Sequence, residues 1–363
     1  MPRSVPLARL RRTDGDGVCA RFASESLDLS TKLNVPSSAS SSVSGLQTPD
    51  SYSPTPAPMN NILLPPDYDY LGVYLTQACH LYCPYCITAH HGAAYRTHRL
   101  SLLSADQWIA GLNRLQLPPD VPVTLQGGEP FLHRGIWQIL ENLRHKIDIL
   151  TALPPFVEPQ RFEKLKTLQW NKRPSPYPTI RVSYHRGQHD FKNLIDRVAE
   201  LQQMLSIGVF YLDHPDYPQQ ELQQMTAYAR KRGVELRSKE FLGSWNGNLC
   251  GTFLYKDAVA GRKLGLDVLC RNTVVPIAPD GTIYRCHSDL YFNRVALALG
   301  NILDEEFEFP AEHLPCQNFG LCSECDVKIK TNRYQIYGYT SADIQFLHKG
   351  SPHELQKAKD SHH

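Results

Sequence analysis

The residues best suited to chemistry in this sequence are its cysteines, of which the 363-residue chain has ten. Six of them form two short clusters: Cys79, Cys83 and Cys86, and Cys316, Cys322 and Cys325. The N-terminus lacks the charged-then-apolar layout of a secretory signal, so we expect a cytoplasmic location. In that reducing compartment, clustered cysteines indicate metal ligation rather than disulfide bonding.

The first cluster has the spacing C-x3-C-x2-C on what reads as a single loop. Three thiolates can hold three irons of a cubane [4Fe–4S] cluster and leave the fourth iron open. An open metal position is what a reactive site needs, since structural metal sites are closed. A Cys3His zinc site completed by His80, His90 or His91 is the alternative that the triad alone leaves open.

The chain around this loop alternates strand and helix patterns. Strands are expected at Tyr70–Thr76, Val121–Gln126, Ile147–Leu153, Thr179–His185, Val209–Leu212 and Val234–Arg237. A capping box of Ser104 and Gln107 opens one expected helix. Further helices are expected at Gly135–His145, Glu158–Leu168, Asp190–Met204 and Gln219–Arg232. Six such units predict an α/β fold, a partial (β/α)6 TIM-like barrel.

A second motif, Gly127-Gly128-Glu129-Pro130, ends the second expected strand, whereas the cysteine loop follows the first. In such barrels the site lies at the C-terminal ends of the strands. Both motifs are therefore expected at the same end of the sheet.

Together, the cysteine loop with Tyr85 before its last cysteine and the GGEP motif resemble the signature of radical S-adenosylmethionine (radical SAM) enzymes. The resemblance extends over about residues 68–330 and disfavours zinc. It implies a [4Fe–4S] cluster whose open iron chelates SAM, and a 5′-deoxyadenosyl radical that abstracts a hydrogen atom from the substrate. It also implies an electron donor such as flavodoxin or ferredoxin. The SAM-binding residues that it implies are Tyr85, Gly127, Gly128, Glu129, Pro130, Ser183 and His185.

The later cysteines suggest a second cluster. Pro279-Asp280-Gly281 is a hairpin turn between Thr273–Ala278 and Thr282–Arg285, which brings the flanking Cys270 and Cys286 together. With Cys316, Cys322 and Cys325, four of five thiols can close an auxiliary [4Fe–4S] cluster with no open iron. Zinc ligation by the same set is the alternative.

This region resembles the SPASM and twitch auxiliary-cluster domains of radical SAM enzymes, through C-x10-G-x4-C at Cys270–Cys286. It departs from the full pattern, since His313 stands where a cysteine is expected and no cysteine follows Cys325. We therefore expect one auxiliary cluster, as in twitch domains. The expected ligands are Cys270, Cys286, Cys322 and Cys325. Cys316 is the alternative to either Cys322 or Cys325. A partial second site of His313 and Cys316 is a further variant, and Cys19 and Cys250 receive no role.

Two polar residues follow Cys286 directly. In some members of this group an acidic residue beside that cysteine accepts a substrate proton. Here the adjacent residue is His287, with Asp289 nearby, so both are candidate catalytic bases.

These features predict four segments. Residues 1–64 form a disordered Ser/Pro-rich tail, because they contain too few large apolar groups to fold. Residues 65–245 form the radical SAM core, 246–335 a small auxiliary-cluster domain with the β-hairpin, and 336–363 a C-terminal tail. The net charge of +2 argues against a nucleic-acid binder, and no apolar run is long enough to span a membrane.

The expected function is a radical SAM oxidoreductase that oxidises or otherwise tailors a small molecule. One alternative is a ribosomal-peptide maturase that cross-links, epimerises or oxidises its substrate. We disfavour it because no segment reads as a winged-helix peptide-binding domain, although a separate protein could supply one. An alternative of another class is a non-catalytic iron–sulfur redox sensor or partner-binding protein, which would have no use for an open iron.

Overall fold

The computed structural model describes residues 60–87, 102–166, 174–261, 266–330 and 337–347. All described residues belong to one compact unit, within Pro56–His363. The predicted N-terminal tail, with Cys19, lies almost wholly outside the described residues. Within those residues, no helix is both long and apolar enough to cross a bilayer.

The central element is a nine-stranded sheet with the order β14-β13-β12-β2-β4-β5-β6-β7-β8. Six neighbouring strands run parallel: β2 Tyr70–Thr76, β4 Val123–Gly127, β5 Ile147–Thr151, β6 Ile180–Tyr184, β7 Ile207–Asp213 and β8 Leu236–Glu240. Each predicted strand is present, in the order that successive crossover connections produce. The chain thus has the large, mostly parallel α/β sheet expected of a partial barrel.

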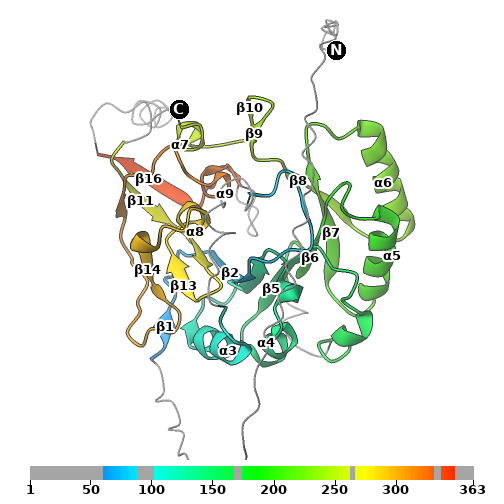
Figure 1. Ribbon diagram of the computed structural model, residues 1–363, viewed down its shortest axis with the longest axis horizontal. Coiled ribbons are helices and arrows are strands. Elements are labelled where there is room, and N and C mark those ends of the chain that lie inside the picture. The colour runs from blue at the N-terminus through cyan, green and yellow to red at the C-terminus, as the bar shows by residue number, and fades with distance from the viewer. Residues whose placement is uncertain (1–59, 88–101, 167–173, 262–265, 331–336, 348–363) are drawn as a thin grey trace, which may run out of the picture. The chain divides into compact units, whose positions relative to one another are not determined.

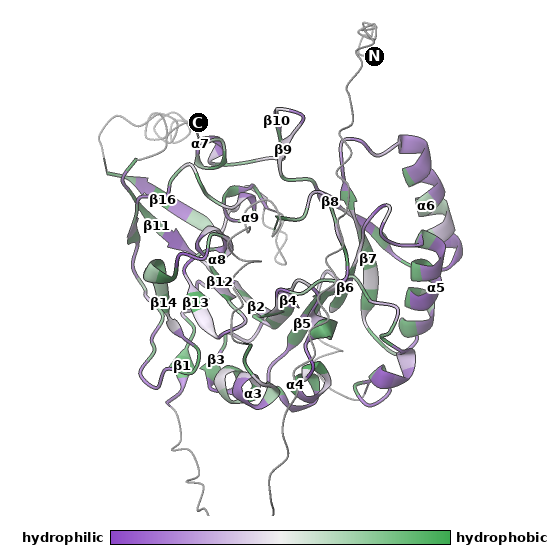
Figure 2. Cartoon of the chain, viewed as in Figure 1, coloured by the Kyte–Doolittle hydropathy of each residue, from purple (hydrophilic) through white to green (hydrophobic). Residues whose placement is uncertain are grey.

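Four helices lie on the outer side of this curved sheet (Figure 1): α3 Ala105–Asn113, α4 Ile136–Asn142, α5 Phe191–Leu201 and α6 Gln219–Lys231. The capping box of α3 is present, because Gln107 N donates to Ser104 Oγ at 3.2 Å and Ser104 N donates to Gln107 Oε1 at 2.9 Å. Figure 2 shows hydrophobic residues along the central strands and hydrophilic ones along the outer sides of α5 and α6. The amphipathic helices therefore bury their apolar faces on the sheet.

Side chains alternate between the two faces of each strand. On β6, Ile180, Val182 and Tyr184 belong to the core beneath the helices, which directs Arg181 and Ser183 to the inner face. The same alternation gives the inner face Tyr70, Tyr74, Gln126, Asp148, Phe210 and Lys239. The barrel interior is therefore rich in polar and aromatic groups.

Several elements differ from the predictions; β4, for example, begins two residues later than predicted, and β7 begins two residues earlier. Of the helix expected at Glu158–Leu168, the described residues contain only the 3-10 turn η2 Pro159–Phe162. Strand β8 begins two residues later than predicted, because Gly233, at a φ of +70°, ends α6 and Val234 N donates to Ala229 O at 2.9 Å. Val234 thus belongs to the helix cap rather than to the strand.

The predicted hairpin consists of β12 Val274–Ile277 and β13 Thr282–Tyr284, followed by β14 Ala298–Asn301. Strand β12 pairs in parallel with β2, with Val274 opposite Tyr70, so the hairpin extends the barrel sheet. The sequence contained no signal for this pairing. The domain boundary between residues 245 and 246 stays a prediction.

Smaller elements complete the fold. A three-stranded antiparallel sheet has the order β15-β11-β16, from Leu314–Cys316, Val268–Asn272 and Ala342–Phe346. The remaining elements are β1 Ile62–Leu63 with β3 Leu115–Gln116, β9 Gly243–Trp245 with β10 Asn248–Cys250, α7 Lys256–Val259, α8 His287–Tyr291, α9 Glu324–Val327, η1 Pro130–Leu132 and η4 Val295–Leu297. Helix α8 packs on the inner face of the sheet, where Leu290 and Tyr291 contact Tyr74 and Ala278.

Candidate active site

The first cysteine cluster lies on the loop that follows β2, at the C-terminal end of the parallel sheet. Within it, Leu81 N donates to Cys79 Sγ at 3.4 Å and Cys86 N donates to Cys83 O at 3.1 Å. None of the nine described cysteines forms a disulfide. The loop thus presents three thiols close together in the chain, as the spacing predicted.

The GGEP motif packs directly on the start of this loop. Gly128 N donates to Thr76 O at 2.8 Å, and Glu129 N donates to Ala78 O at 2.8 Å. A Cβ atom on Gly128 would lie 2.2 Å from Ala78 O, closer than atoms can approach. Glycine is therefore required here, because the turn holds the residue preceding Cys79 through backbone contact alone.

The Glu129 side chain is fully buried and joins the ends of two strands. Its carboxylate accepts hydrogen bonds from Thr151 Oγ1 at 2.7 Å, Ala152 N at 2.7 Å and Phe131 N at 3.1 Å. Burial raises the pKa of Glu129 to about 7, although these donors favour the ionised form. The side chain therefore has a structural role that the sequence analysis did not anticipate.

Tyr85 packs into an aromatic group at the ends of β6 and β7. Its hydroxyl lies 3.3 Å from His185 Nδ1 and 3.2 Å from Tyr217 Oη, and its ring centroid lies 5.4 Å from that of His214. Burial, together with the hydrogen bond to Tyr217, raises the pKa of Tyr85, so the phenol keeps its proton. Burial also lowers the pKa of His185 to about 4. Tyr85 and His185 are therefore neutral at physiological pH.

Polar atoms beside the cysteine loop lack partners within the described part of the chain. Both amide atoms of Gln77 and both ring nitrogens of His80 are buried without a hydrogen bond there, and so is Nε2 of His214. Buried polar atoms are normally paired, so this arrangement suits a polar ligand. SAM, with its amino, carboxylate and adenine groups, fits the site. Ser183, half-buried on the inner face, lies two residues before His185.

Residues 73–229 match the sequence model of the Radical SAM superfamily. The match covers the cysteine loop, the GGEP turn and the parallel strands from within β2 to β7. No curated protein matches the chain.

Two solved structures are similar to this chain at low identity. One is Streptococcus suis SuiB bound to S-adenosylmethionine, with 14% identity and a TM-score of 0.33. The match covers 66% of this chain and 63% of that one. The other is Streptococcus suis SuiB bound to the precursor peptide SuiA, with 15% identity, a TM-score of 0.33, and coverage of 66% and 64%. The chain thus spans less than two thirds of either structure.

A second cavity lies among the later cysteines. The thiols that line it are Cys270, Cys286, Cys316 and Cys322. Arg285 donates to Cys316 Sγ at 3.7 Å, and Asp289 N donates to Cys286 Sγ at 3.4 Å. Four thiols with neighbouring cationic and N–H donors are suited to a closed [4Fe–4S] cluster.

The thiols of this cavity are close enough to influence one another. Burial, then the charges of Cys316 and Cys322, raises the pKa of Cys270 well above its usual value. Burial, then Cys316, raises the pKa of Cys322 to about 12. Such thiols ionise only with a compensating cation, which iron supplies. The described residues contain no group of three His, Cys, Asp or Glu arranged to hold a single ion.

Cys325, which the sequence analysis placed among the ligands, does not line this cavity, whereas its alternative Cys316 does. Strand register explains the position of Cys316. Antiparallel pairing sets Val268 opposite Cys316, so that Cys270 and Cys316 share one face of neighbouring strands. Cys325 lies in α9, where the charges that act on its thiol come chiefly from Lys328, Asp326 and Lys330.

The two proposed bases already have partners. His287 Nδ1 lies 2.8 Å from Asp326 Oδ1, and His287 N donates to the same carboxylate. Asp289, buried, is paired with Arg285 Nε at 2.5 Å and Arg294 Nη1 at 2.9 Å. These contacts give Asp289 a structural role at the cavity wall. His313 pairs with Asp343 at 3.0 Å and is absent from the cavity lining.

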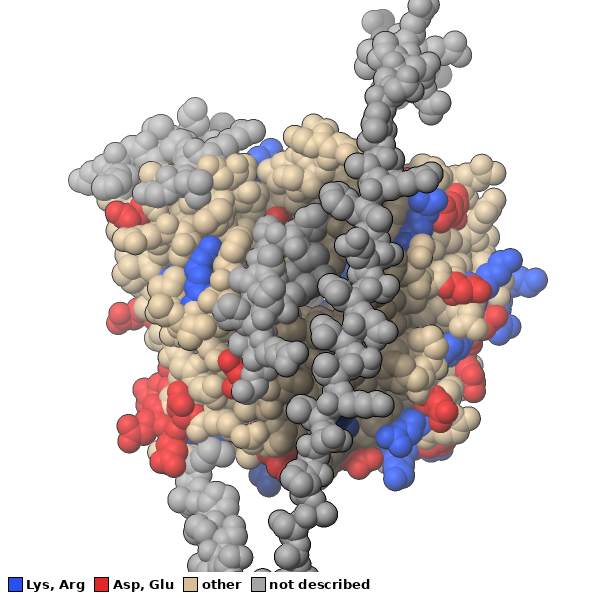
Figure 3. All heavy atoms as spheres, in the orientation of Figure 1, with Lys and Arg blue, Asp and Glu red and all other residues tan. Residues whose placement is uncertain are grey.

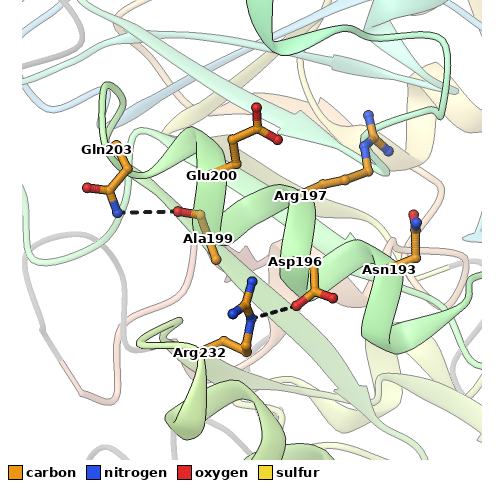
Figure 4. A pocket seen from close by; sticks show the side chains of 7 residues that line it. All are labelled: Asn193, Asp196, Arg197, Ala199, Glu200, Gln203 and Arg232. Atoms are coloured by element: carbon orange, nitrogen blue, oxygen red, sulfur yellow. Dashed lines mark hydrogen bonds and ion pairs between the residues drawn. The ribbon is translucent and has the colours of Figure 1, made fainter.

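A hollow on the outer surface, between α5 and α6, carries none of these motifs (Figure 4). Asp196 pairs there with Arg232 at 2.6 Å, and Arg197 donates to three backbone carbonyls. Asp196, Arg197 and Arg232 are therefore already paired there.

The residues predicted from the sequence did not include Gln77, His214, Tyr217 and Arg285. Gln77 and His214 each follow a strand of the parallel sheet, and that position was an available signal. The contact between Tyr217 and Tyr85, 132 residues apart, had none.

Proposed function

We propose that this chain is a radical SAM enzyme that cleaves SAM reductively and uses the product to oxidise or tailor a small molecule. The observation that carries the proposal is the backbone contact between the GGEP turn and residues 76–78, which sets a SAM-binding motif against the cysteine loop. Cys79, Cys83 and Cys86 would hold the open [4Fe–4S] cluster. Cys270, Cys286, Cys316 and Cys322 would hold the auxiliary one.

Bound in this site, cluster and SAM would supply a 5′-deoxyadenosyl radical, with one electron from a flavodoxin or ferredoxin. The residues of the chain position and shield that chemistry. Glu129 fixes the ends of β4 and β5, and Gly128 allows close backbone approach to the loop. Aromatic side chains on the inner face, including Tyr74 and Tyr291, exclude water from the interior.

The proposal is tested with anaerobically reconstituted protein, SAM and dithionite. We expect about eight irons per chain, as two cubane clusters require, and formation of 5′-deoxyadenosine and methionine. Cys83→Ala is expected to abolish cleavage, because the open cluster loses a ligand. Cys322→Ala is expected to leave uncoupled cleavage largely intact. SAM cleavage by Cys83→Ala would refute the central assignment.

A further inference from the structure

The inner face of the barrel holds a lysine without a counterion. Lys239, on β8, makes no ion pair or hydrogen bond with any residue that the structure describes. Its ammonium lies over the Phe210 ring, 5.1 Å from the centroid. A half-buried cation of this kind is costly unless an anion joins it.

The groups around Lys239 are themselves cationic. Burial, then the charges of Arg181 on β6 and Lys328 after α9, lowers its pKa to about 7, and only the Cys325 thiol acts the other way. The charge of Lys239 also lowers the pKa of His185, the residue that follows β6. Among the residues that the structure describes, no carboxylate has a charge that influences the pKa of Lys239.

Arg181 has capacity left for a ligand as well. One of its terminal nitrogens pairs with Asp148 at 3.2 Å, which compensates part of its charge. Its Nε is buried without a hydrogen-bond partner among the described residues. Nearby, Gln126 accepts from the Tyr70 hydroxyl at 3.1 Å, while its own Nε2 also lacks a partner there.

The outer surface contrasts with this interior. On the face visible in Figure 3, Lys and Arg side chains are scattered, and many of the outer cations are paired, as Arg186 is with Glu221 and Arg232 with Asp196. On the inner face of the barrel, where a substrate of the proposed reaction would lie, Lys239 is therefore a cation without such a partner, and the charges of Arg181 and Lys328 act on it.

We propose that Lys239 and Lys328, with Arg181, form a binding site for an anionic group of the substrate, a carboxylate or a phosphate. This inference rests on the proposed function, since it names the substrate class of the same interior. Lys239 and Lys328 bind the anion, and Arg181 Nε supplies a third donor. Anionic oxygens satisfy such donors through strong charge-assisted hydrogen bonds.

The test uses reconstituted full-length protein with malonate and inorganic phosphate as probes, in separate arms, against potassium chloride of equal ionic strength. The readout is trace acetylation of Lys239 at pH 7.5, measured by peptide mass spectrometry. Lys192 is the matched control, because it also lies over an aromatic ring, that of Tyr228, but on the outer helix α5. The arm that protects Lys239 identifies the anion class.

We expect saturable protection of Lys239 by at least one probe and none of Lys192. In Lys328→Gln, the probe concentration for half-protection should rise about tenfold, as expected for one lost charged hydrogen bond, and Lys328→Arg should restore it. Equal protection by chloride, or none, would overturn the proposal. Complete protection by SAM alone, with no further effect of either probe, would assign the cations to the SAM carboxylate and overturn it too.

The same samples are assayed for 5′-deoxyadenosine, which separates the two proposals. Protection without SAM cleavage would refute only the proposed function. Cleavage without protection would refute only the anion site. Circular dichroism of the Lys328 variants verifies that they are folded.

Discussion

The hydroxyl of Thr151 donates a hydrogen bond to the carboxylate of Glu129, with 2.7 Å between the two oxygens. Glu129 belongs to the GGEP turn after β4 and Thr151 ends β5, so one buried carboxylate joins two strand ends beside the cysteine loop. The side chain of Glu129 thus bonds to groups of the protein itself, irrespective of any contact that its backbone makes with a ligand.

Glu129→Gln should therefore change how stability depends on pH. The pKa of Glu129 is raised from 4.5 to about 7, so its contribution to stability is complete below pH 4.5 and is lost as the pH rises through 7. That loss is on the order of 3 kcal/mol. Urea unfolding at pH 5.5 and pH 8 should show a smaller pH dependence in the variant than in the parent protein. Glu141→Gln, at an exposed position of α4, is the control and should leave the dependence unchanged.

Gly128→Ala should displace the cysteine loop. The new methyl group would lie 2.2 Å from Ala78 O and 2.4 Å from Gln77 O, both of them backbone atoms that cannot rotate away. We expect a fall of about 100-fold or more in SAM cleavage, as a displacement near 1 Å produces, with loss of about four irons. Gly187→Ala is the control, since nothing lies within 4 Å of its added Cβ. Its positive φ should cost about 1–2 kcal/mol of stability without affecting cleavage. Full activity in Gly128→Ala would contradict the packing argument.

The cavity lined by four thiols leads to a prediction about the auxiliary ligands. In a background with Cys79, Cys83 and Cys86 all changed to alanine, about four irons should remain in the auxiliary cluster. Adding Cys316→Ala should remove them, because Cys316 lines the cavity, whereas adding Cys325→Ala should not. Iron and sulfide analysis with Mössbauer spectroscopy makes the comparison. The reverse result would restore the ligand set expected from the sequence.

Local signals in the sequence predicted much of the fold. The strand Tyr70–Thr76 has its predicted bounds, because a continuous apolar, β-prone segment is fully buried in the sheet. The helix after Ser104 begins where the capping box requires. Cysteine spacing and GGEP together located one end of the sheet. These features depend on neighbours along the chain.

What the sequence could not predict depends on strand pairing between distant segments. The place of Cys316 beside Cys270 follows from the register of β11 against β15, and the three-residue β15 has no recognisable strand pattern. The parallel pairing of β12 with β2 is equally non-local. The burial of Glu129 against Thr151 and the influence of the Arg181 and Lys328 charges on Lys239 depend on the three-dimensional arrangement of distant segments.

Tyr85→Phe should weaken SAM binding without affecting the cluster. The change removes the hydroxyl that contacts His185 and Tyr217 but keeps the ring that packs against His214. Loss of a hydrogen bond of about 1 kcal/mol predicts a SAM dissociation constant raised about fivefold, measured by equilibrium dialysis on reconstituted protein. Tyr82→Phe is the matched control, because Tyr82 lies in the same loop with 80% of its surface exposed and should bind SAM as the parent does. Iron content should be equal in all three proteins. A loss of iron in Tyr85→Phe would mean that the hydroxyl supports the cysteine loop rather than the ligand.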